Sequence, residues 1–482
     1  MSSSHSNSDR PWRVVVIGGG VSGLAAAFRL QELAGAANRP IDLTVCEASD
    51  ALGGIVGTRE IAGYRVELGA DSFITNKPGA INLCRRLGLD GELIPTDARY
   101  RRSLVLSRGK PMPVPEGFQL LAPNAMWPVW RSPIFSLAGK LRLAAEYFVP
   151  AAQQPVEDES LASFVRRRFG QEALERLVQP LVGGIYTSDP EKLSLRGTMP
   201  RFLEMEAKHG SLIRALRHEA RSSTTQDRTA SGARYGLFAT PRLGISQMVD
   251  ALIARVQTSA TIRLNCVVSQ VTPATDGATY QLEFADGTRA PYDAVVVATP
   301  AYRAASVLRT VCPGAAGALD EIEYASTAIV VSGHRLSDVA NPLDAFGLVV
   351  PAIEKRKILA VSFTSRKFPG RAPEGCVELR TFVGGAMQPE LVDQSDDQIL
   401  ELVRRELHEL LGVVWKPDFA IVARWMRSMP QYHVGHLDKI ARIETDLKSQ
   451  PHLGLAGNAL YGVGLPDTIA SGERAAERIF QG

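Results

Sequence analysis

A glycine-rich hexapeptide near the start of the chain has the spacing of a phosphate-binding turn. Residues 18–23 read GGGVSG, which matches the pattern G-x-G-x-x-G. In such a turn the first glycine permits a tight bend, the second lets the backbone approach a pyrophosphate, and the third permits close helix–strand packing. The phosphates lie at the helix N-terminus. The turn therefore predicts a dinucleotide site formed by Gly18, Gly20, Val21, Ser22 and Gly23.

The elements on either side of this turn have the order that such a site needs. Val14–Ile17 is a β-branched run typical of a buried parallel strand, and Val21–Leu33 has the pattern of a helix. Alternating apolar residues at 41–45 predict a second strand that ends at Glu47. An acid in that place can accept a hydrogen bond from the ribose of an adenosine. The resulting βαβ unit predicts a bound dinucleotide but does not distinguish NAD from FAD.

Length and composition exclude several classes of protein. The chain has 482 residues, of which 45% are hydrophobic and 22% charged, as in globular proteins with large cores. Its 54 basic and 51 acidic residues give a net charge of +3, which argues against a nucleic-acid partner. None of the five cysteines forms a C-x-x-C pair, and His433 and His436 lack further ligands nearby, so we expect no metal site. We expect a cytoplasmic protein with at most peripheral membrane contact.

Strand and helix signals later in the chain predict an α/β fold assembled from distant segments. Strands are predicted at 262–271, 280–284, 294–298, 358–364, 377–383 and 453–456, and helices at 161–169, 173–181, 398–411 and 466–480. We expect a Rossmann-like dinucleotide domain, a mixed-sheet substrate domain and a helical lobe. The expected division is a disordered tail (1–10), the dinucleotide domain (11–98, 231–310 and 446–482), a helical, substrate-channel lobe (99–230) and the substrate domain (311–445).

Three motifs together resemble the FAD-binding proteins related to glutathione reductase and monoamine oxidase. Glu47 is followed by Gly53-Gly54 as in the family pattern E-x3-R-x-G-G, although Ala51 stands where the family has arginine. Residues 294–300 (AVVVATP) and the glycine-rich segment 457–467 resemble the second and third flavin motifs. The resemblance implies FAD as cofactor. With the turn above, the expected FAD-binding residues are Gly18, Gly20, Val21, Ser22, Gly23, Glu47, Gly53, Gly54, Val56, Gly57, Gly69, Ala70, Asp71, Ser72, Val268, Ala298, Trp425, Gly457, Asn458, Gly462, Val463 and Gly464.

Nearly the whole chain resembles the protoporphyrinogen/coproporphyrinogen oxidase family of haem biosynthesis. The resemblance is carried by residues 66–73 (VELGADSF), by P-x3-G-I-Y-x2-D-x3-L-S at 180–194 and by residues 382–386 (FVGGA). The segment W-x4-P-Q-Y at 425–432 adds to it. The family implies a six-electron oxidation of a porphyrinogen by flavin and molecular oxygen, with no catalytic acid or base assigned. It also implies a possible transfer of the product to ferrochelatase, and a homo-oligomer is possible.

The substrate would be a flat apolar macrocycle with carboxylates at its rim, so we expect an apolar slot with cations at its mouth. Candidate cations are Arg101, Arg102, Arg108 and Lys110, although a solvated basic loop is the simpler interpretation. In a gapless alignment Ser103 occupies the position of an arginine common in protoporphyrinogen enzymes, which favours coproporphyrinogen III; a one-residue gap would restore Arg102 and protoporphyrinogen IX. The expected substrate contacts are Arg102, Ser103, Arg108, Gly184, Ile185 and Tyr186.

Other interpretations stay open at this point. An amine oxidase or carotene-type desaturase, a flavin-stabilised carrier protein and an NAD-linked dehydrogenase each share part of the pattern. The aromatic stretch from Trp127 to Phe148 is expected to be helical core, with a channel wall or a membrane-dipping surface as alternatives. Arg166–Arg168 is expected on a solvated helix face and Cys46 in the core. Residues 221–232 are polar and predict a mobile loop.

Overall fold

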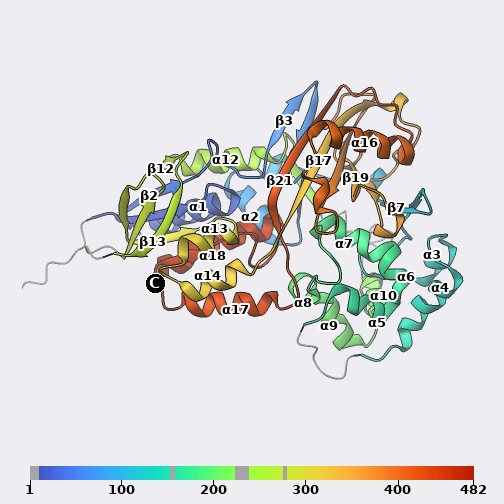
Figure 1. Cartoon of the computed structure of the whole chain (residues 1–482), viewed down its shortest axis with the longest axis horizontal. Helices are drawn as coiled ribbons and strands as arrows, with labels where there is room; N and C mark the ends of the chain where they lie inside the picture. The colour runs from blue at the N-terminus through green and yellow to red at the C-terminus, as the bar shows by residue number, and fades with distance from the viewer. Residues whose placement is uncertain (1–9, 152–157, 223–237, 275–278, 482) are drawn as a thin grey trace, which may run out of the picture.

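The computed structural model describes residues 10–151, 158–222, 238–274 and 279–481. Figure 1 shows an elongated molecule with a parallel sheet at one end, a larger sheet at the other and a helical lobe beside the larger sheet. The expected tail, apart from Arg10, and residues 223–232 of the expected loop lie outside the described residues; Arg221 and Ser222 belong to a helix. None of the described helices is long and apolar enough to span a bilayer.

A five-stranded parallel sheet collects strands from three distant parts of the chain. Its order is β12-β2-β1-β16-β22, and every neighbouring pair is parallel. Val14 and Val16 face one side of the sheet and Val15 and Ile17 the other, so both faces are buried. The strands are β1 (Trp12–Ile17), β2 (Ile41–Cys46), β12 (Ala260–Arg263), β16 (Ala294–Val297) and β22 (Leu453–Leu455).

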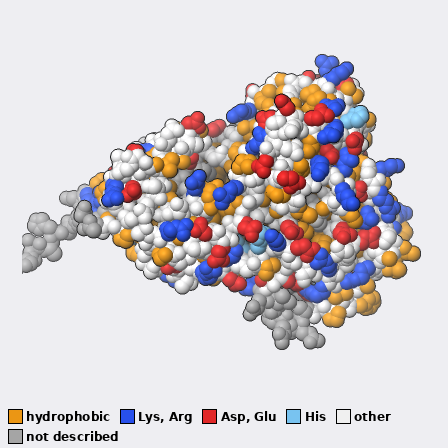
Figure 2. Space-filling model, viewed as in Figure 1, with side chains coloured by type: hydrophobic (Ala, Val, Ile, Leu, Met, Phe, Trp, Pro, Cys, Tyr) orange, Lys and Arg blue, Asp and Glu red, His pale blue; other side chains and the backbone are white. Residues whose placement is uncertain are grey.

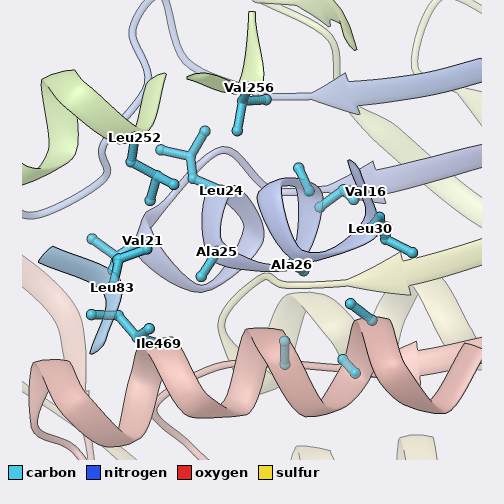
Figure 3. Packing of buried hydrophobic residues seen from close by; sticks show 14 of the residues in the cluster. Val16, Val21, Leu24, Ala25, Ala26, Leu30, Leu83, Leu252, Val256 and Ile469 are labelled. Atoms are coloured by element: carbon cyan, nitrogen blue, oxygen red, sulfur yellow. The ribbon is translucent and has the colours of Figure 1, made fainter. Parts of the chain in front are cut away.

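Helices cover both faces of this sheet. On one face α1 packs directly against α18, so closely that a Cβ on Gly472 would lie 2.1 Å from the carbonyl oxygen of Ser22. Figure 3 shows Leu24 and Leu30 of α1 packed among side chains from this layer. This layer comprises α1 (Val21–Ala36), α2 (Pro78–Arg86), α12 (Ser246–Val256) and α18 (Leu465–Gln481); the other comprises α13 (Ala301–Leu308), α14 (Pro313–Asp320) and α17 (His436–Leu447).

The strand expected over residues 262–271 is in fact two strands, and this prediction is wrong. β12 ends at Arg263 in the parallel sheet, whereas β13 begins at Val268 in a separate antiparallel sheet. Asn265 between them has φ +52°, a left-handed conformation that breaks a strand. The second sheet consists of β13 (Val268–Pro273), β14 (Tyr280–Phe284) and β15 (Arg289–Tyr292).

A seven-stranded mixed sheet forms the other end of the molecule, in the order β21-β17-β20-β19-β18-β7-β8. All its pairs are antiparallel except β18 with β7, and α16 (Asp396–Leu411) packs on it. β7 and β8 belong to this sheet, although their segment was expected in the helical lobe (99–230). The start of the lobe therefore differs from the expected division, and the other domain boundaries stay predictions. The strands are β7 (Leu104–Ser107), β8 (Lys110–Pro113), β17 (Tyr324–Arg335), β18 (Gly347–Val349), β19 (Ala360–Phe363), β20 (Cys376–Gly384) and β21 (Phe419–Pro430).

The helical lobe has its own core, in which Phe118, Phe164 and Leu177 are fully buried. The middle of the expected helix 173–181 is a π-helical turn (Leu174–Val178) between α6 and α7. The helices are α3 (Met126–Arg131), α4 (Leu137–Ala144), α5 (Leu161–Phe169), α6 (Gln171–Ala173), α7 (Gln179–Tyr186), α8 (Leu195–Thr198), α9 (Pro200–His209) and α10 (Leu212–Ser222).

Two expectations for this lobe are wrong in part. Arg168 lies inside it rather than on a solvated face: its side chain is fully buried and pairs with Glu146 and Glu206. Trp127 and Phe148 are 65% and 86% exposed rather than core residues, although Phe135 of the same stretch is buried. Hydrophobic side chains are visible at the lower right of Figure 2, whereas charges of both signs are interspersed over the rest of that face.

Shorter elements join these layers. β4 leads from the surface hairpin to the cavity described below, and β11 pairs with both β5 and β6. Cys46 at the end of β2 is buried, as expected. The short elements are β3 (Thr58–Ile61), β4 (Tyr64–Glu67), β5 (Phe73–Ile74), β6 (Leu93–Pro95), β9 (Phe118–Gln119), β10 (Ala122–Pro123), β11 (Phe238–Pro241) and α15 (Thr364–Lys367).

Candidate functional site

One cavity of about 670 Å³ joins the glycine-rich ends of the parallel sheet to the seven-stranded sheet and α7. Such a junction between two layers is a common place for a cofactor and its substrate to meet. Sixteen of the expected FAD-binding residues line it, together with three expected substrate residues. These are Gly20, Val21, Ser22, Gly53, Gly54, Val56, Gly69, Ala70, Asp71, Ser72, Ala298, Trp425, Gly457, Asn458, Val463 and Gly464, and Ser103, Gly184 and Ile185.

The three glycines of the hexapeptide differ in what surrounds them. Gly18 has φ +108°, and a Cβ there would lie 2.6 Å from the carbonyl oxygen of Ala298. A Cβ on Gly23 would lie 1.9 Å from the carbonyl oxygen of Gly18, so this residue permits close helix–strand packing. A Cβ on Gly20 would meet no protein atom within 4 Å, because this position opens on the cavity. The turn therefore holds free space at the N-terminus of α1, where an anionic group is stabilised.

Glu47 directly follows β2 and is held in a fixed orientation, although it does not line the cavity. Its carboxylate accepts hydrogen bonds from the backbone N–H of Gly19 at 2.7 Å and of Ser49 at 2.8 Å. Two carboxylate oxygens can accept about four hydrogen bonds, so capacity remains for a ribose hydroxyl. Gly18, Gly23, Gly57, Val268 and Gly462 are also outside the cavity wall. Their contacts with FAD, and that of Glu47, stay predictions.

Tyr432 holds the C-terminal glycine loop against the helical lobe. Its hydroxyl donates to the carbonyl oxygen of Asn458 and accepts from the backbone N–H of Gly462, both at 2.7 Å. Burial raises the pKa of Tyr432 far above its usual value, so the hydroxyl stays protonated and can donate. Gly462 has φ +150°, and a Cβ there would lie 2.3 Å from Oδ2 of Asp467. This loop leads directly into α18.

Three charged side chains form one largely buried cluster in the cavity wall. Nζ of Lys367 lies 3.0 Å from both carboxylate oxygens of Asp71, and Nη1 of Arg380 lies 3.3 Å from Oδ2. Burial opposes ionisation of Asp71, but the two cations outweigh it and hold the pKa of Asp71 below its usual range. Asp71 was expected in the site, whereas Lys367 and Arg380 were not identified because only tertiary packing brings them there.

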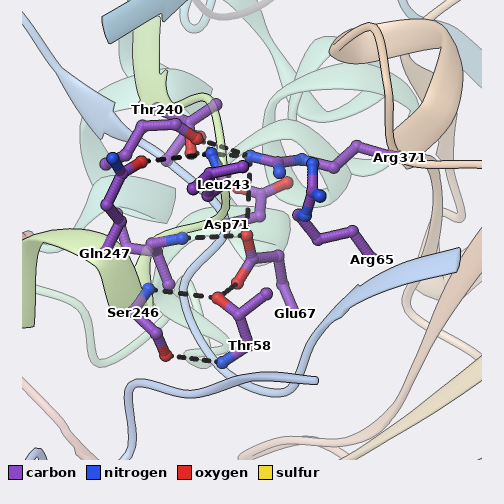
Figure 4. A network of polar contacts seen from close by, with 12 residues as sticks. Thr58, Arg65, Glu67, Asp71, Thr240, Leu243, Ser246, Gln247 and Arg371 are labelled. Carbon is purple, nitrogen blue, oxygen red and sulfur yellow. Dashed lines mark hydrogen bonds and ion pairs between the residues drawn. The ribbon is translucent and has the colours of Figure 1, made fainter. Parts of the chain in front are cut away.

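A polar network behind this cluster fixes the chain that leads into the cavity (Figure 4). The carboxylate of Glu67 accepts from Thr58 Oγ1 at 2.7 Å and from the backbone N–H of Ile245 at 3.0 Å, and lies 3.5 Å from Arg371. Burial raises the pKa of Glu67 despite Arg371. Because Glu67 ends β4, these contacts position the following residues 69–72, all of which line the cavity.

Two expected substrate cations lie away from the cavity wall. Arg102 forms an exposed ion pair with Asp344, and the backbone N–H of Arg108 donates to Glu354. Tyr186 also lies outside it, and its hydroxyl donates to the carbonyl oxygen of Thr198 at 3.3 Å. The structure therefore brings Ser103, Gly184 and Ile185 to the cavity but not Arg102, Arg108 or Tyr186; nor do Arg101 and Lys110 line it.

Strand β21 supplies Trp425 and a cation that the sequence analysis missed. Nε1 of Trp425 donates to the carbonyl oxygen of Leu68 at 2.8 Å, which fixes its ring in the cavity wall. Arg427, two residues later, also lines the cavity and lies over the ring of Tyr302. Its position inside the segment W-x4-P-Q-Y was the only sequence signal for it.

Comparison with known proteins gives the family. The model of the flavin-containing amine oxidoreductases matches residues 21–480. Coproporphyrinogen III oxidase of Bacillus subtilis is 35% identical, with 97% of this chain and 98% of the relative covered. The chain belongs to the porphyrinogen oxidases of this flavin family. Chloroplastic protoporphyrinogen oxidase of Nicotiana tabacum is 30% identical, with 96% and 85% covered.

Structural comparison agrees with this family. A crystal structure of an Exiguobacterium protein assigned as a protoporphyrinogen oxidase superposes with a TM-score of 0.85 at 28% identity, covering 98% of the present porphyrinogen oxidase and 99% of the other chain. The family and the parallel sheet confirm the expected α/β fold, the flavoenzyme class and FAD as cofactor. The amine oxidoreductase model describes the wider family, and the more similar curated relatives act on porphyrinogens.

The cavity of this porphyrinogen oxidase fits FAD on its own evidence. Gly20 leaves room beside the N-terminus of α1 for a pyrophosphate. Oγ1 of Thr299 and of Thr187 are buried in the cavity wall without a hydrogen-bond partner among the described residues, so a bound molecule could satisfy them. Among the same residues, no group of three or more His, Cys, Asp or Glu could hold a metal ion.

Proposed function

We propose that this porphyrinogen oxidase oxidises coproporphyrinogen III to coproporphyrin III, with O2 as the final electron acceptor. The macrocycle loses six electrons and six hydrogens, and three O2 are reduced to three H2O2. FAD supplies the two-electron chemistry when bound. The observation that carries the proposal is that the glycine turn and an apolar wall formed by Val349, Phe382 and Ile185 line the same cavity.

The protein's own groups have the task of binding and orienting the macrocycle. Apolar walls exclude water from the reacting carbon, and Trp425 is fixed in the wall by its hydrogen bond to Leu68. Asp71 neutralises much of the charge of Lys367 and Arg380, so these cations stay in place without a bound anion. Each two-electron oxidation would remove a hydride from carbon and a proton from a pyrrole N–H. The proton would leave to solvent and be consumed when O2 is reduced to H2O2, so no side chain is assigned to carry it.

Protoporphyrinogen IX is the second candidate, supported by the plant relative named above. The preference for coproporphyrinogen III is supported by the Bacillus subtilis relative, and by Ser103, which is nearly fully buried and lines the cavity where the alternative alignment would need Arg102. Arg102 is half-exposed and already paired with Asp344. Coproporphyrinogen III carries two more propionates than protoporphyrinogen IX. Cations other than Arg102 would bind them.

The test is aerobic turnover of both porphyrinogens by one preparation, followed by porphyrin fluorescence. We expect kcat/KM for coproporphyrinogen III to exceed that for protoporphyrinogen IX by at least about tenfold, the effect of one additional charge-assisted contact. The reverse preference would move the enzyme to the second candidate. Turnover of neither compound, by protein that retains FAD, would contradict the proposal.

The proposal extends to the surroundings of the enzyme. A cytoplasmic location with at most peripheral membrane contact agrees with the exposed side chains of Trp127 and Phe148. The product would then pass to ferrochelatase, and a homo-oligomer stays possible. Cosedimentation with vesicles and light scattering of the purified protein test the membrane contact and the oligomeric state.

A further inference from the structure

Among the described residues, one charged side chain in the cavity wall is available to a new anion. The described part of the chain places four such side chains there: Asp71, Lys367, Arg380 and Arg427. Lys367 and Arg380 both form ion pairs with Asp71. Arg427 is exposed, and it forms no ion pair with a carboxylate among the described residues. An anion that enters this cavity would meet Arg427 without displacing an existing partner.

An irregularity in the pairing of β21 determines the backbone conformation at Arg427. The pairing of β17 with β21 shifts register between Ala325 and Thr327, so that Ser326 alone faces residues 426–428. Arg427 in this bulge has φ +46°, a left-handed conformation that is uncommon for a residue with a side chain. Its backbone N–H donates to Ser326 Oγ at 2.9 Å, which holds the bulge. Bulges of this kind often re-aim a side chain beside an active site.

Tyr302 supports the guanidinium from one side. Cζ of Arg427 lies 4.0 Å from the centroid of the Tyr302 ring, a favourable cation–π distance. A guanidinium has five N–H donors, so a contact with one ring leaves donors available to an anion. Met426 is 52% exposed and also lines the cavity, which places an apolar side chain next to this cation. A cation beside an apolar surface matches a propionate on a porphyrin ring.

We propose that Arg427 binds a propionate carboxylate of the porphyrinogen and thereby contributes to substrate affinity. This inference rests on the proposed function. The same chemistry would suit a phosphate of FAD, the other anion expected in the cavity. The propionate is favoured because the phosphates are expected at the N-terminus of α1 beside Gly20, whereas Arg427 belongs to the seven-stranded sheet. An arginine–carboxylate pair is often bidentate and therefore also orients the bound ring.

The test compares Arg427→Met with Arg427→Lys and with the control Arg303→Met. Arg303 is exposed and also lies near the Tyr302 ring, at 5.8 Å, but it does not line the cavity. For Arg427→Met we expect KM for coproporphyrinogen III to rise on the order of tenfold, with kcat changed less than about twofold, because the lost contact serves binding. Arg427→Lys should recover part of the affinity, and Arg303→Met should behave as the wild type.

Two measurements other than turnover show whether Arg427 binds a propionate of the substrate or a phosphate of FAD. Equilibrium binding of coproporphyrin III should weaken in Arg427→Met by a factor similar to that in KM, while binding of its tetramethyl ester should not change. FAD content and the FAD dissociation constant should match the wild type. Weaker FAD binding with unchanged porphyrin affinity would assign Arg427 to a phosphate and overturn the inference.

The inference and the proposed function can fail separately. An unchanged KM in Arg427→Met, with a wild type that turns over coproporphyrinogen III, overturns the role of Arg427 alone. A wild type with bound FAD that oxidises no porphyrinogen contradicts the proposed function and, with it, this inference.

Discussion

At the scale of single residues, the site separates glycines that pack against protein from glycines that leave room for a ligand. The motif G-x-G-x-x-G could be identified from the sequence because each position has a steric reason. The structure adds that Gly18 and Gly23 are needed by the fold, since a Cβ at either would meet a backbone oxygen, whereas Gly20 faces open space. Loss of cofactor and loss of fold should therefore be separable by mutation.

We predict that Gly20→Glu folds normally but no longer retains FAD. Gly20 has φ −73°, which any residue adopts, and no protein atom lies near its missing Cβ. A carboxylate there would repel the pyrophosphate; two unit charges 4 Å apart near a protein surface repel by about 4 kcal/mol, enough to weaken binding by more than about a hundredfold. Flavin absorbance of the purified protein, with circular dichroism for folding, measures both effects.

Gly23→Ala is the matched control, because its added Cβ would lie 1.9 Å from the carbonyl oxygen of Gly18. We expect this smaller substitution to lower the free energy of unfolding by about 1–3 kcal/mol. Full flavin content in Gly20→Glu would disprove the placement of the pyrophosphate at this turn.

The charged residues of the site show where sequence reasoning stops. Asp71 and Ser103 were identified through resemblance to a family motif and an alignment. Lys367 and Arg380 lie in or next to predicted strands with no motif of their own, and they reach the cavity only through the pairing of β19 with β20 and their contact with Asp71. Arg102 and Arg108 were proposed as cations for the propionates, but neither lines the cavity. Arg102 pairs instead with Asp344, which is distant in the chain.

At the scale of elements, α5 illustrates how three successive arginines acquire different environments. Helical spacing predicts that consecutive residues point in different directions. Arg166 is on the surface and pairs with Glu191, whereas Arg168 is fully buried with Glu146 and Glu206. The expectation of a solvated face was wrong for Arg168 because the sequence does not reveal Glu146 as its buried partner.

We predict that Arg168→Met destabilises the helical lobe by about 3–5 kcal/mol, because Glu146 would remain buried without its cation. Arg166→Met, on the same helix, should cost less than about 1 kcal/mol, since its ion pair is exposed. Urea unfolding followed by tryptophan fluorescence measures both variants, with Trp127 and Trp130 reporting on the lobe. Equal effects of the two substitutions would contradict the buried ion pair.

A buried histidine at the start of α17, His436, predicts that the folded protein is less stable in acid. His436 is stacked on Tyr432 at 3.8 Å, and its Nε2 donates to the carbonyl oxygen of Leu460. Burial lowers the pKa of His436 to about 4. His436 binds a proton near pH 6.5 in the unfolded chain but only near pH 4 in the folded chain. The stabilisation of the folded state by neutral His436 is therefore complete above about pH 6.5 and is lost as the pH falls toward 4.

We expect His436 to account for on the order of 2–3 kcal/mol of the decrease in unfolding free energy between pH 7 and pH 4.5. His436→Gln retains a donor for Leu460 but does not titrate, so its decrease should be smaller by that amount. Denaturant unfolding at the two pH values measures the difference. An identical decrease in the two proteins would show that His436 does not titrate in this way.

At the scale of the whole molecule, the parallel sheet could be predicted from sequence although its strands are distant in the chain. Buried β-branched runs, a glycine turn and two later flavin motifs were enough to assign residues 14–17, 294–298 and 453–456 to one domain. The recruitment of β7 and β8 into the seven-stranded sheet was not predictable, because β7 pairs with β18 across more than two hundred residues. Local patterns carry no information on such partners.

The central functional claim concerns the cavity between the parallel sheet and the seven-stranded sheet: it would hold FAD where a porphyrinogen can transfer electrons to it. The most direct measurement is anaerobic mixing of the FAD-loaded enzyme with coproporphyrinogen III, followed by flavin absorbance. We predict rapid bleaching of the oxidised flavin at a rate that supports turnover, and recovery of its absorbance with H2O2 formation when O2 is admitted. A flavin that stays oxidised in the presence of both coproporphyrinogen III and protoporphyrinogen IX would contradict the account.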